Sequence, residues 1–269
     1  MAIYDCFQFH NEETVLDLRL NILNNYVDFF VIAESTVDHQ GNIKKLNFDV
    51  NKYKKFQKKI IYIIVDDTKE IIKKPHIGQN SLTEQHQRNS ILRGLKNSRD
   101  DDLIIISDVD EIPDLSKLKY LDKKKRYAVF AQRKFDYKIN LLNITEGDWL
   151  GSKICLKKNL RSPQWLRNLK FKKYSFWRFD KIRDVQIIKN GGWHFSYLQS
   201  PGDILKKISS FSHGERNIKK FKNIKRIEEK INLLENIFDL GFKYKKINID
   251  DTFPSYLNKN KDKFKNWII

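Results

Sequence analysis

Short hydrophobic runs that end in polar residues recur along the first part of the chain. Residues 3–9, 29–33 and 60–65 are rich in β-branched and aromatic side chains, which predicts buried strands. Between the first two runs, acidic residues that suit a first helical turn precede hydrophobic residues at helical spacing: Val15, Leu16, Leu20 and Leu23. This alternation predicts an α/β fold, with a central, mostly parallel sheet flanked by helices.

The most hydrophobic run, residues 103–106, ends in Asp108, Asp110 and Glu111. Three carboxylates so close together repel one another unless a cation compensates, and an extended Asp-x-Asp segment can aim both Asp side chains at one ion. Ligands of open α/β sheets bind outside the carboxyl ends of the strands. The pattern therefore predicts a ligand and metal site here, although a solvated loop that caps the next helix is the alternative.

The segment before this strand, residues 81–95, predicts a helix whose hydrophobic face includes Arg88. The helix runs antiparallel to the strand that follows it, so its first half lies near the acidic residues. Arg88 can pair with those acids or reach a ligand phosphate. A structural ion pair with Glu84 remains the alternative.

Two polar features in the second half of the chain also predict a site. Asp148 stands beside Trp149 between two glycines, which suits a pocket wall with an aromatic face for a sugar and a carboxylate that acts as base, although a turn with a half-buried Trp explains it equally well. His194 lies in a short aromatic strand, where a histidine is more often a core residue. A polar loop at residues 212–217 could fold over a ligand.

The composition is that of a folded protein, because 40% of the 269 residues are hydrophobic and 13% aromatic. The formal charge of +18 could attract nucleic acid, an anionic membrane surface or a phosphorylated substrate. Much of it, however, is scattered Lys, as in residues 52–59 and 219–230, which favours solvated faces.

Compartment and domain organisation follow from simpler features. Two cysteines imply no disulfide framework, and no hydrophobic run approaches about 18 residues, so we expect a cytoplasmic protein with at most a peripheral membrane association. One domain over residues 1–241 is the simplest organisation, followed by a small C-terminal helical extension, residues 242–269, that is packed on it or loosely ordered.

Four motifs in order resemble glycosyltransferase family 17: residues 28–34, Gln87-Arg88 ahead of Gly94-Leu95, residues 107–113 and residues 191–196. The resemblance extends from Ile3 to about Asn217. It implies a GT-A-like fold and inverting transfer of a sugar, typically N-acetylglucosamine from UDP-N-acetylglucosamine, to a glycan acceptor. It also implies a divalent ion, Mn²⁺ or Mg²⁺, at the Asp-x-Asp.

The resemblance also gives roles to the candidate residues. Asp110 would bind the ion, with Asp108 on the ribose or on a metal-bound water and His194 as a further ligand. Three residues would hold the sugar or diphosphate or close over it: Arg88, His213 and Arg216. Glu34 would line the nucleotide pocket.

The acceptor hydroxyl needs a general base, and Asp148 is the first candidate because of its position along the chain, followed by Glu111 and Glu146. Two other functions use some of the same features. A metal-dependent phosphatase can employ an Asp-x-Asp, but its nucleophile usually follows the first strand. A nucleic-acid-binding module explains the basic charge but not three acids at the end of a strand.

Overall fold

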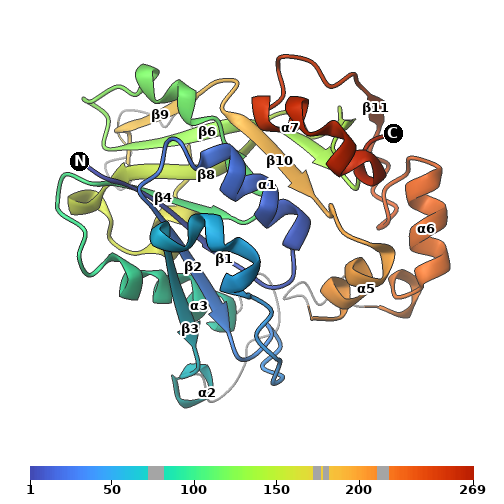
Figure 1. Ribbon diagram of the computed structural model, residues 1–269, viewed down its shortest axis with the longest axis horizontal. Helices are drawn as coiled ribbons and strands as arrows, with labels where there is room; N and C mark the ends of the chain where they lie inside the picture. The colour runs from blue at the N-terminus through green and yellow to red at the C-terminus, as the bar shows by residue number, and fades with distance from the viewer. Residues whose placement is uncertain (72–81, 172–176, 178–181, 211–217) are drawn as a thin grey trace.

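The computed structural model describes residues 1–71, 82–171, 177, 182–210 and 218–269. Its centre is an 11-stranded sheet with the order β11-β7-β6-β8-β4-β1-β2-β3, in which β9 and β10 also pair with β6, and β5 pairs with β10 (Figure 1). The strands are β1 (Ile3–Gln8), β2 (Phe29–Ser35), β3 (Ile60–Val65), β4 (Leu103–Asp108), β5 (Glu111–Pro113), β6 (Tyr127–Asp136), β7 (Leu141–Asn143), β8 (Trp149–Leu156), β9 (Val185–Ile188), β10 (Gly192–Ser196) and β11 (Tyr244–Lys246).

Short helices connect the strands. The α-helices are α1 (Glu13–Leu23), α2 (Thr68–Ile71), α3 (Leu82–Asn89), α4 (Pro163–Asn168), α5 (Pro201–Ser210), α6 (Ile224–Asn232) and α7 (Ser255–Lys259). The 3₁₀ helices are η1 (Val50–Lys59), η2 (Ser90–Leu95), η3 (Leu115–Tyr120), η4 (Lys157–Asn159), η6 (Lys219–Phe221) and η7 (Lys261–Trp267). The helix predicted over residues 81–95 is therefore split into α3 and η2.

The first half of the sheet is the parallel βαβ arrangement that the sequence predicts. β4, β1, β2 and β3 are parallel neighbours, and Asp5 of β1 lies between Phe30 of β2 and Ile105 of β4. The second half is mixed, because β8 runs antiparallel to both β4 and β6. The α/β class is confirmed, but the hydrophobic pattern did not predict the antiparallel pairings of β5, β7, β8 and β11.

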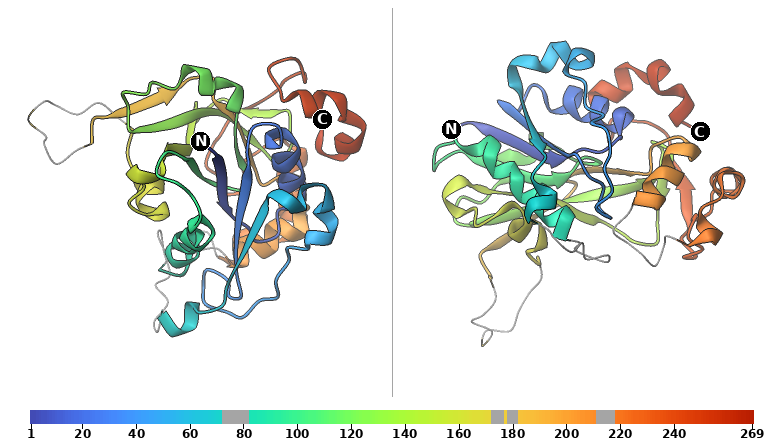
Figure 2. Two further views of the ribbon diagram at one scale, coloured as in Figure 1. Left: turned by 60° about the vertical axis from the view of Figure 1, so that its left-hand side comes forward. Right: turned by 90° about the horizontal axis from the view of Figure 1, so that it is seen from below.

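Hydrophobic cores cover both faces of the sheet. Along β4, Ile105 packs with α1, η1 and the C-terminal helices, whereas Ile104 and Ile106 pack on the opposite face with η2 and α4. Figure 2 shows these helices on either side of the sheet. The alternation of side chains along a strand explains why such an uninterrupted hydrophobic run is needed.

Residues 242–269 share the core of this domain. β11 pairs with β7, and Phe253, Leu257 and Phe264 are buried in the same cluster as α1. A third core cluster joins α5 and α6 to the end of β6, through side chains such as Ile204 and Ile227.

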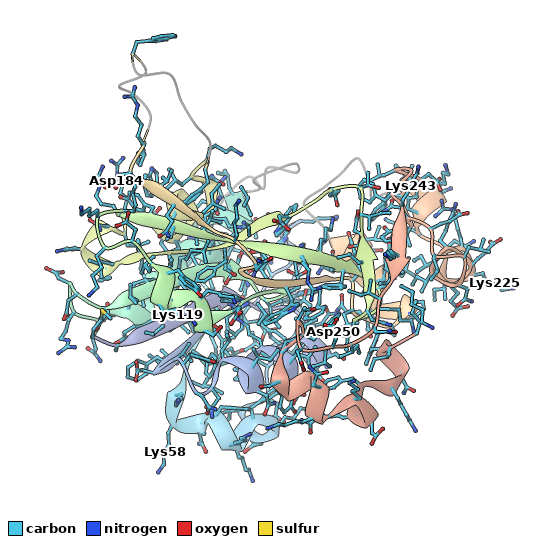
Figure 3. All side chains as sticks on the ribbon, turned by 90° about the horizontal axis from the view of Figure 1, so that it is seen from above. Lys58, Lys119, Asp184, Lys225, Lys243 and Asp250 are labelled. Atoms are coloured by element: carbon cyan, nitrogen blue, oxygen red, sulfur yellow. The ribbon has the colours of Figure 1, made fainter. Side chains whose placement is uncertain are left out.

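Lys58 and Lys225 lie at different edges of the molecule in Figure 3. Within the described ranges, no helix combines the length and the hydrophobicity that crossing a membrane requires.

A buried arginine joins the sheet to the segment after β4. Arg19 of α1 is fully buried and forms two hydrogen bonds with Asp5, at 2.8 and 2.6 Å. Its Nη1 also donates to the main-chain oxygens of Asp108 (3.1 Å), Val109 (3.2 Å) and Glu111 (2.7 Å). One guanidinium therefore fixes the turn in which the acidic residues lie.

Lys153 of β8 is a second buried cation, and it supports the end of α4. Its Nζ donates to the main-chain oxygens of Arg167 and, at 3.0 Å, of Leu169. Burial, aided by the nearby positive charge of Arg167, lowers the pKa of Lys153 to about 7.

Replacing Arg19 by Met should destabilise the protein strongly, because Asp5 would remain buried without its partner. Loss of one partner of a buried pair typically costs about 3–5 kcal/mol. Urea unfolding gives this value, with Lys52→Met as the matched control, since it breaks an exposed ion pair with Glu13 and should change little. A loss below about 1 kcal/mol for Arg19→Met would contradict the proposed support.

Lys153 should make stability depend on pH. Its folded-state pKa is about 7 and lies below that of an unfolded lysine, so the unfolded state binds more protons between these values and stability rises as the pH increases through this window. The Lys153→Met variant lacks this contribution. Thermal unfolding from pH 6 to pH 9 should therefore show a rise for the wild type relative to the variant, and parallel curves would refute the assignment.

Candidate active site

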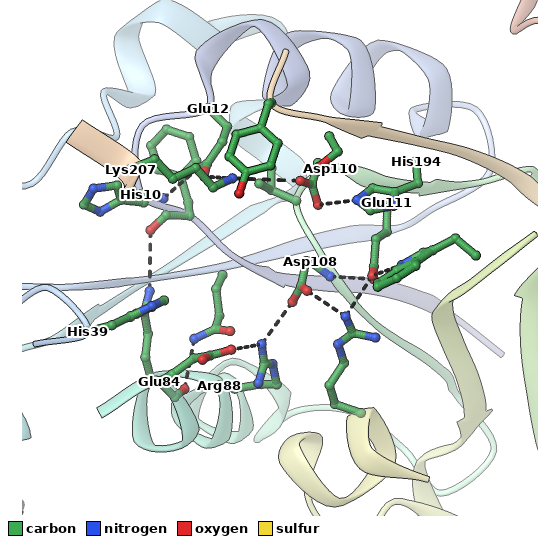
Figure 4. Close-up of a pocket in the computed structure, with 18 of the residues that line it drawn as sticks. His10, Glu12, His39, Glu84, Arg88, Asp108, Asp110, Glu111, His194 and Lys207 are labelled. Atoms are coloured by element: carbon green, nitrogen blue, oxygen red, sulfur yellow. Dashed lines mark hydrogen bonds and ion pairs between the residues drawn. The ribbon is translucent and has the colours of Figure 1, made fainter. Parts of the chain in front are cut away.

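A cavity of about 420 Å³ opens at the carboxyl ends of β1 and β4, where the sequence predicts the site (Figure 4). Several elements supply its lining, and most of the side chains are polar. The lining residues are Gln8, Phe9, His10, Glu12, His39, Glu84, Gln87, Arg88, Asp108, Val109, Asp110, Glu111, Lys134, Trp149, Gln164, Arg167, Asn168, His194, Ser196, Tyr197 and Lys207.

Asp108 is held between two arginines. Arg88 of α3 donates to its Oδ1 at 3.0 Å, and Arg167 of α4 donates to its Oδ2 at 2.7 Å. Burial opposes the charged form, but Arg167 and Arg88 outweigh it and hold the pKa of Asp108 well below its usual value. Arg88 also pairs with Glu84 at 2.8 Å. The two ion pairs predicted as alternatives for Arg88, with the acids after β4 and with Glu84, are therefore both present.

Asp110 faces a different set of partners. Its Oδ1 lies 3.6 Å from Nε2 of His194, and its Oδ2 lies 3.9 Å from Nζ of Lys207, which pairs with Glu12 at 3.1 Å. Burial would raise the pKa of Asp110, but His194 and Lys207 together lower it. The charged form of the carboxylate is therefore favoured.

The three predicted metal ligands do not converge. Among the described residues, no group of three His, Cys, Asp or Glu side chains is arranged to hold a metal ion. Asp110 and His194 still form an oxygen and nitrogen donor pair, whereas both oxygens of Asp108 accept from arginines. A divalent ion held by two protein ligands would take its other ligands from substrate phosphates and water, and the imidazole nitrogen of this pair suits Mn²⁺ better than Mg²⁺.

Glu111 lines the cavity but is only 1% exposed. Its Oε1 accepts from Nε1 of Trp149 at 2.6 Å and from Arg167 at 2.8 Å, while its Oε2 accepts from the main-chain N–H of Asp108 at 3.0 Å. A side chain at Gly151 would lie 2.8 Å from the Glu111 carboxyl carbon, which explains the glycine after Trp149. Glu111 therefore orients its neighbours, which argues against its predicted role as a base.

Asp148, the first candidate for the base, does not line the cavity. Its side chain is exposed, and it acts electrostatically on Arg133. Trp149, the first residue of β8, contributes to the cavity wall, whereas Asp148 lies in the bend before the strand. The sequence placed the acid and the Trp together but could not show that only the Trp lines the cavity. Glu146, behind it in the ranking, pairs with Lys134.

Glu34 is also placed differently from the prediction. It is fully buried and accepts from Lys44 (2.6 Å), from the main-chain N–H groups of Asn47 (2.7 Å) and Phe48 (3.0 Å), and from the Tyr62 hydroxyl (2.9 Å). Its carboxylate fixes the loop after β2, and Glu34 is not among the residues that line the cavity. His213 and Arg216 lie outside the described residues.

Arg167, Lys207 and Glu12 were not predicted as site residues from the sequence. Arg167 comes from α4, which begins at Ser162-Pro163, where the Ser162 hydroxyl accepts from the N–H of Trp165 at 3.1 Å. That Ser-Pro pair signals a helix start, but nothing in the sequence places the helix against Asp108. Lys207 lies on α5, and only the fold brings it to Glu12 at the start of α1.

Several known proteins resemble this chain. The β-1,4-mannosyl-glycoprotein 4-β-N-acetylglucosaminyltransferases of Homo sapiens and Rattus norvegicus are each 22% identical to it over 245 residues, which cover 79% of this chain. The matches cover 44% and 43% of those proteins, so the chain spans less than half the length of these curated relatives.

Among solved structures, HddC from Yersinia pseudotuberculosis gives a TM-score of 0.35 at 11% identity, covering 70% of this chain and 90% of HddC. The galactosyltransferase LgtC, in complex with donor and acceptor sugar analogues, gives 0.32 at 12% identity and covers 59% of each chain. At such scores these two structures add nothing to what the sheet topology of this chain already shows.

The sequence profile of glycosyltransferase family 17 matches residues 1–267. The fold is GT-A-like, as predicted, with the acidic residues at the carboxyl end of a parallel strand in a mixed α/β sheet. Since the match covers almost the whole sequence, the chain belongs to glycosyltransferase family 17.

Proposed function

We propose that this chain is an inverting, metal-dependent glycosyltransferase that moves N-acetylglucosamine from UDP-N-acetylglucosamine to a hydroxyl of a glycan. The observation that carries the proposal is the arrangement of Asp108, Asp110 and two arginines in one cavity of a family 17 chain. The name of the animal relatives, which specifies an N-acetylglucosaminyltransferase, supports the choice of donor sugar.

The two arginines are suited to the diphosphate of the donor. Guanidinium groups bind phosphate oxygens through charge-assisted, often bidentate hydrogen bonds. Arg88 and Arg167 lie on either side of Asp108, and Lys207 adds a third cation beside Asp110. In this proposal the arginines share their hydrogen bonds between Asp108 and the diphosphate when the donor is bound.

Asp110 and His194 would hold a divalent ion, and Mn²⁺ accepts an imidazole ligand more readily than Mg²⁺ does. Such an ion, when bound, would stabilise the negative charge that develops on the leaving diphosphate. Lys207, which pairs with Glu12, would keep Asp110 ionised and correctly oriented. Asp108 would contact the ribose or a metal-bound water and stay fixed by its arginines.

The alternative functions have less support. The match to a glycosyltransferase family favours neither a phosphatase nor a nucleic-acid-binding module. We also propose that the enzyme is cytoplasmic and that its basic surface contacts an anionic membrane surface from outside the bilayer.

UDP should bind more tightly in MnCl₂ than in EDTA, because the ion would join the diphosphate to Asp110 and His194. Titration calorimetry measures both affinities. The Asp110→Asn variant should lose most of the difference, while Asp251→Asn, a change at an exposed site, should keep it. Equal affinities in the two buffers would reject metal dependence, and no binding of UDP in either would reject the proposed function.

Replacing Arg167 by Gln should weaken UDP binding roughly 10- to 100-fold, the usual effect of losing a hydrogen bond to a charged group. The matched control is Arg161→Gln, because Arg161 is an exposed arginine just before the same helix. Calorimetry with Mn²⁺ present gives both values. An unchanged affinity for Arg167→Gln would show that Arg167 serves only to hold Asp108.

A further inference from the structure

A second cavity, of about 290 Å³, adjoins the first. The two cavities share Lys134, Trp149 and Tyr197 in their linings. The remaining walls of the second cavity come from the end of β6, from Glu146 between β7 and β8, and from the segment between α6 and β11, including Phe238 and Phe242. This volume lies near the small end of ligand pockets, so it suits a compact group and not a long chain.

Asp136, the last residue of β6, lines this second cavity and is only 2% exposed. Its Oδ2 accepts from Nδ2 of Asn143 at 3.0 Å, and the Tyr244 hydroxyl also hydrogen-bonds to the carboxylate. Among the described residues, its Oδ1 has no hydrogen-bond partner, and the nearest cation, Nζ of Lys134, is 4.0 Å away. A buried carboxylate oxygen without a partner is costly and therefore calls for a ligand.

The strand register connects Asp136 to the donor cavity. β6 and β10 are parallel, with His194 beside Lys134 and Ser196 beside Asp136. Residues two apart on a strand point to the same side, so Lys134 and Asp136 face the same way. Lys134 borders both cavities, and Asp136 lies two residues after it on the same face of β6.

Aromatic side chains form half of the second cavity's wall. Five of its ten lining residues are aromatic: Tyr137, Trp149, Tyr197, Phe238 and Phe242. Tyr137 and Tyr197 have positive φ values of 64° and 54°, a conformation that bulky residues rarely adopt and that tends to occur at functional sites. Aromatic faces with a few polar groups suit a sugar ring, which presents C–H groups on its faces and hydroxyls at its edge.

We propose that this second cavity binds the terminal sugar of the acceptor glycan and that Asp136 accepts the proton of its attacking hydroxyl. The inference rests on the proposed transferase function and adds to it the acceptor subsite and the base. It also fits the position of the cavity, because an acceptor here lies next to a donor in the first cavity.

The reaction is balanced without another reactant. The acceptor oxygen forms a bond to the anomeric carbon of the donor sugar from the side opposite the leaving group, and the bond between that carbon and the diphosphate oxygen breaks. The hydroxyl proton passes to the free Oδ1 of Asp136, and the electron pair of the broken bond leaves with UDP. Lys134 and Asn143 stay in place and orient the carboxylate.

Binding of simple glycosides tests the subsite. Saturation-transfer NMR with the methyl β-glycosides of glucose, galactose, mannose and N-acetylglucosamine, in the presence of UDP and Mn²⁺, should detect at least one of them bound to the wild type. Phe242→Ala should reduce that signal at least fivefold, while Asp251→Asn should not. Binding of UDP without binding of any glycoside would overturn the subsite and leave the donor site intact, whereas failure to bind UDP would overturn the proposed function itself.

Transfer from UDP-N-acetylglucosamine to the glycoside that binds tests the base. Asp136→Asn should lower kcat by about two to four orders of magnitude, with little change in the glycoside's KM or in UDP affinity. Phe242→Ala should chiefly raise the KM. The assignment is overturned if Asp136→Asn retains more than about a tenth of wild-type kcat, or if Asp148→Asn, and not Asp136→Asn, abolishes transfer.

Discussion

The fully buried pair of Arg19 and Asp5 supports the whole site. Asp5 lies in the middle of β1, and Arg19 reaches past it to three main-chain oxygens in the turn after β4. Burying these charges is costly, and the cost is offset only because every donor of the guanidinium is directed at an acceptor. The turn that carries Asp108, Asp110 and Glu111 is therefore held from behind, which leaves its acidic side chains free to face the cavity.

The same turn would be unstable if its three carboxylates faced only one another. Arg167 contacts Asp108 and Glu111, Arg88 contacts Asp108, and Lys207 lies beside Asp110. Each cation comes from a different helix, so the acids are compensated only when α3, α4 and α5 are all docked. Docking of the helices therefore also balances the charges in the cavity. The same cations are already in position for a ligand that carries phosphate.

The sequence predicts best where a local pattern determines the structure. Strand-forming runs located β1 to β4, and three acids after Ile106 located the cavity. It predicted least where distant segments meet. Nothing local tells that Arg167 reaches Asp108 from α4 or that Glu34 turns to the loop after β2. Nor does it tell that Trp149 lines the cavity while Asp148, in the bend before β8, does not. Asp148 was chosen as the base from its order along the chain, which says nothing about the direction of a side chain.

β6 shows how one strand can join two cavities. Its alternate residues Gln132, Lys134 and Asp136 point to one face, while Phe135 packs into the core on the other. Lys134 borders both cavities, and Asp136 follows it by the length of two residues, so the strand itself sets the spacing between them. A transferase must hold two substrates at a fixed distance, and a rigid central strand can do so more reliably than a loop. β10 pairs with β6 and places His194 beside Lys134, so the hydrogen bonds of the sheet also fix the distance between the two cavities.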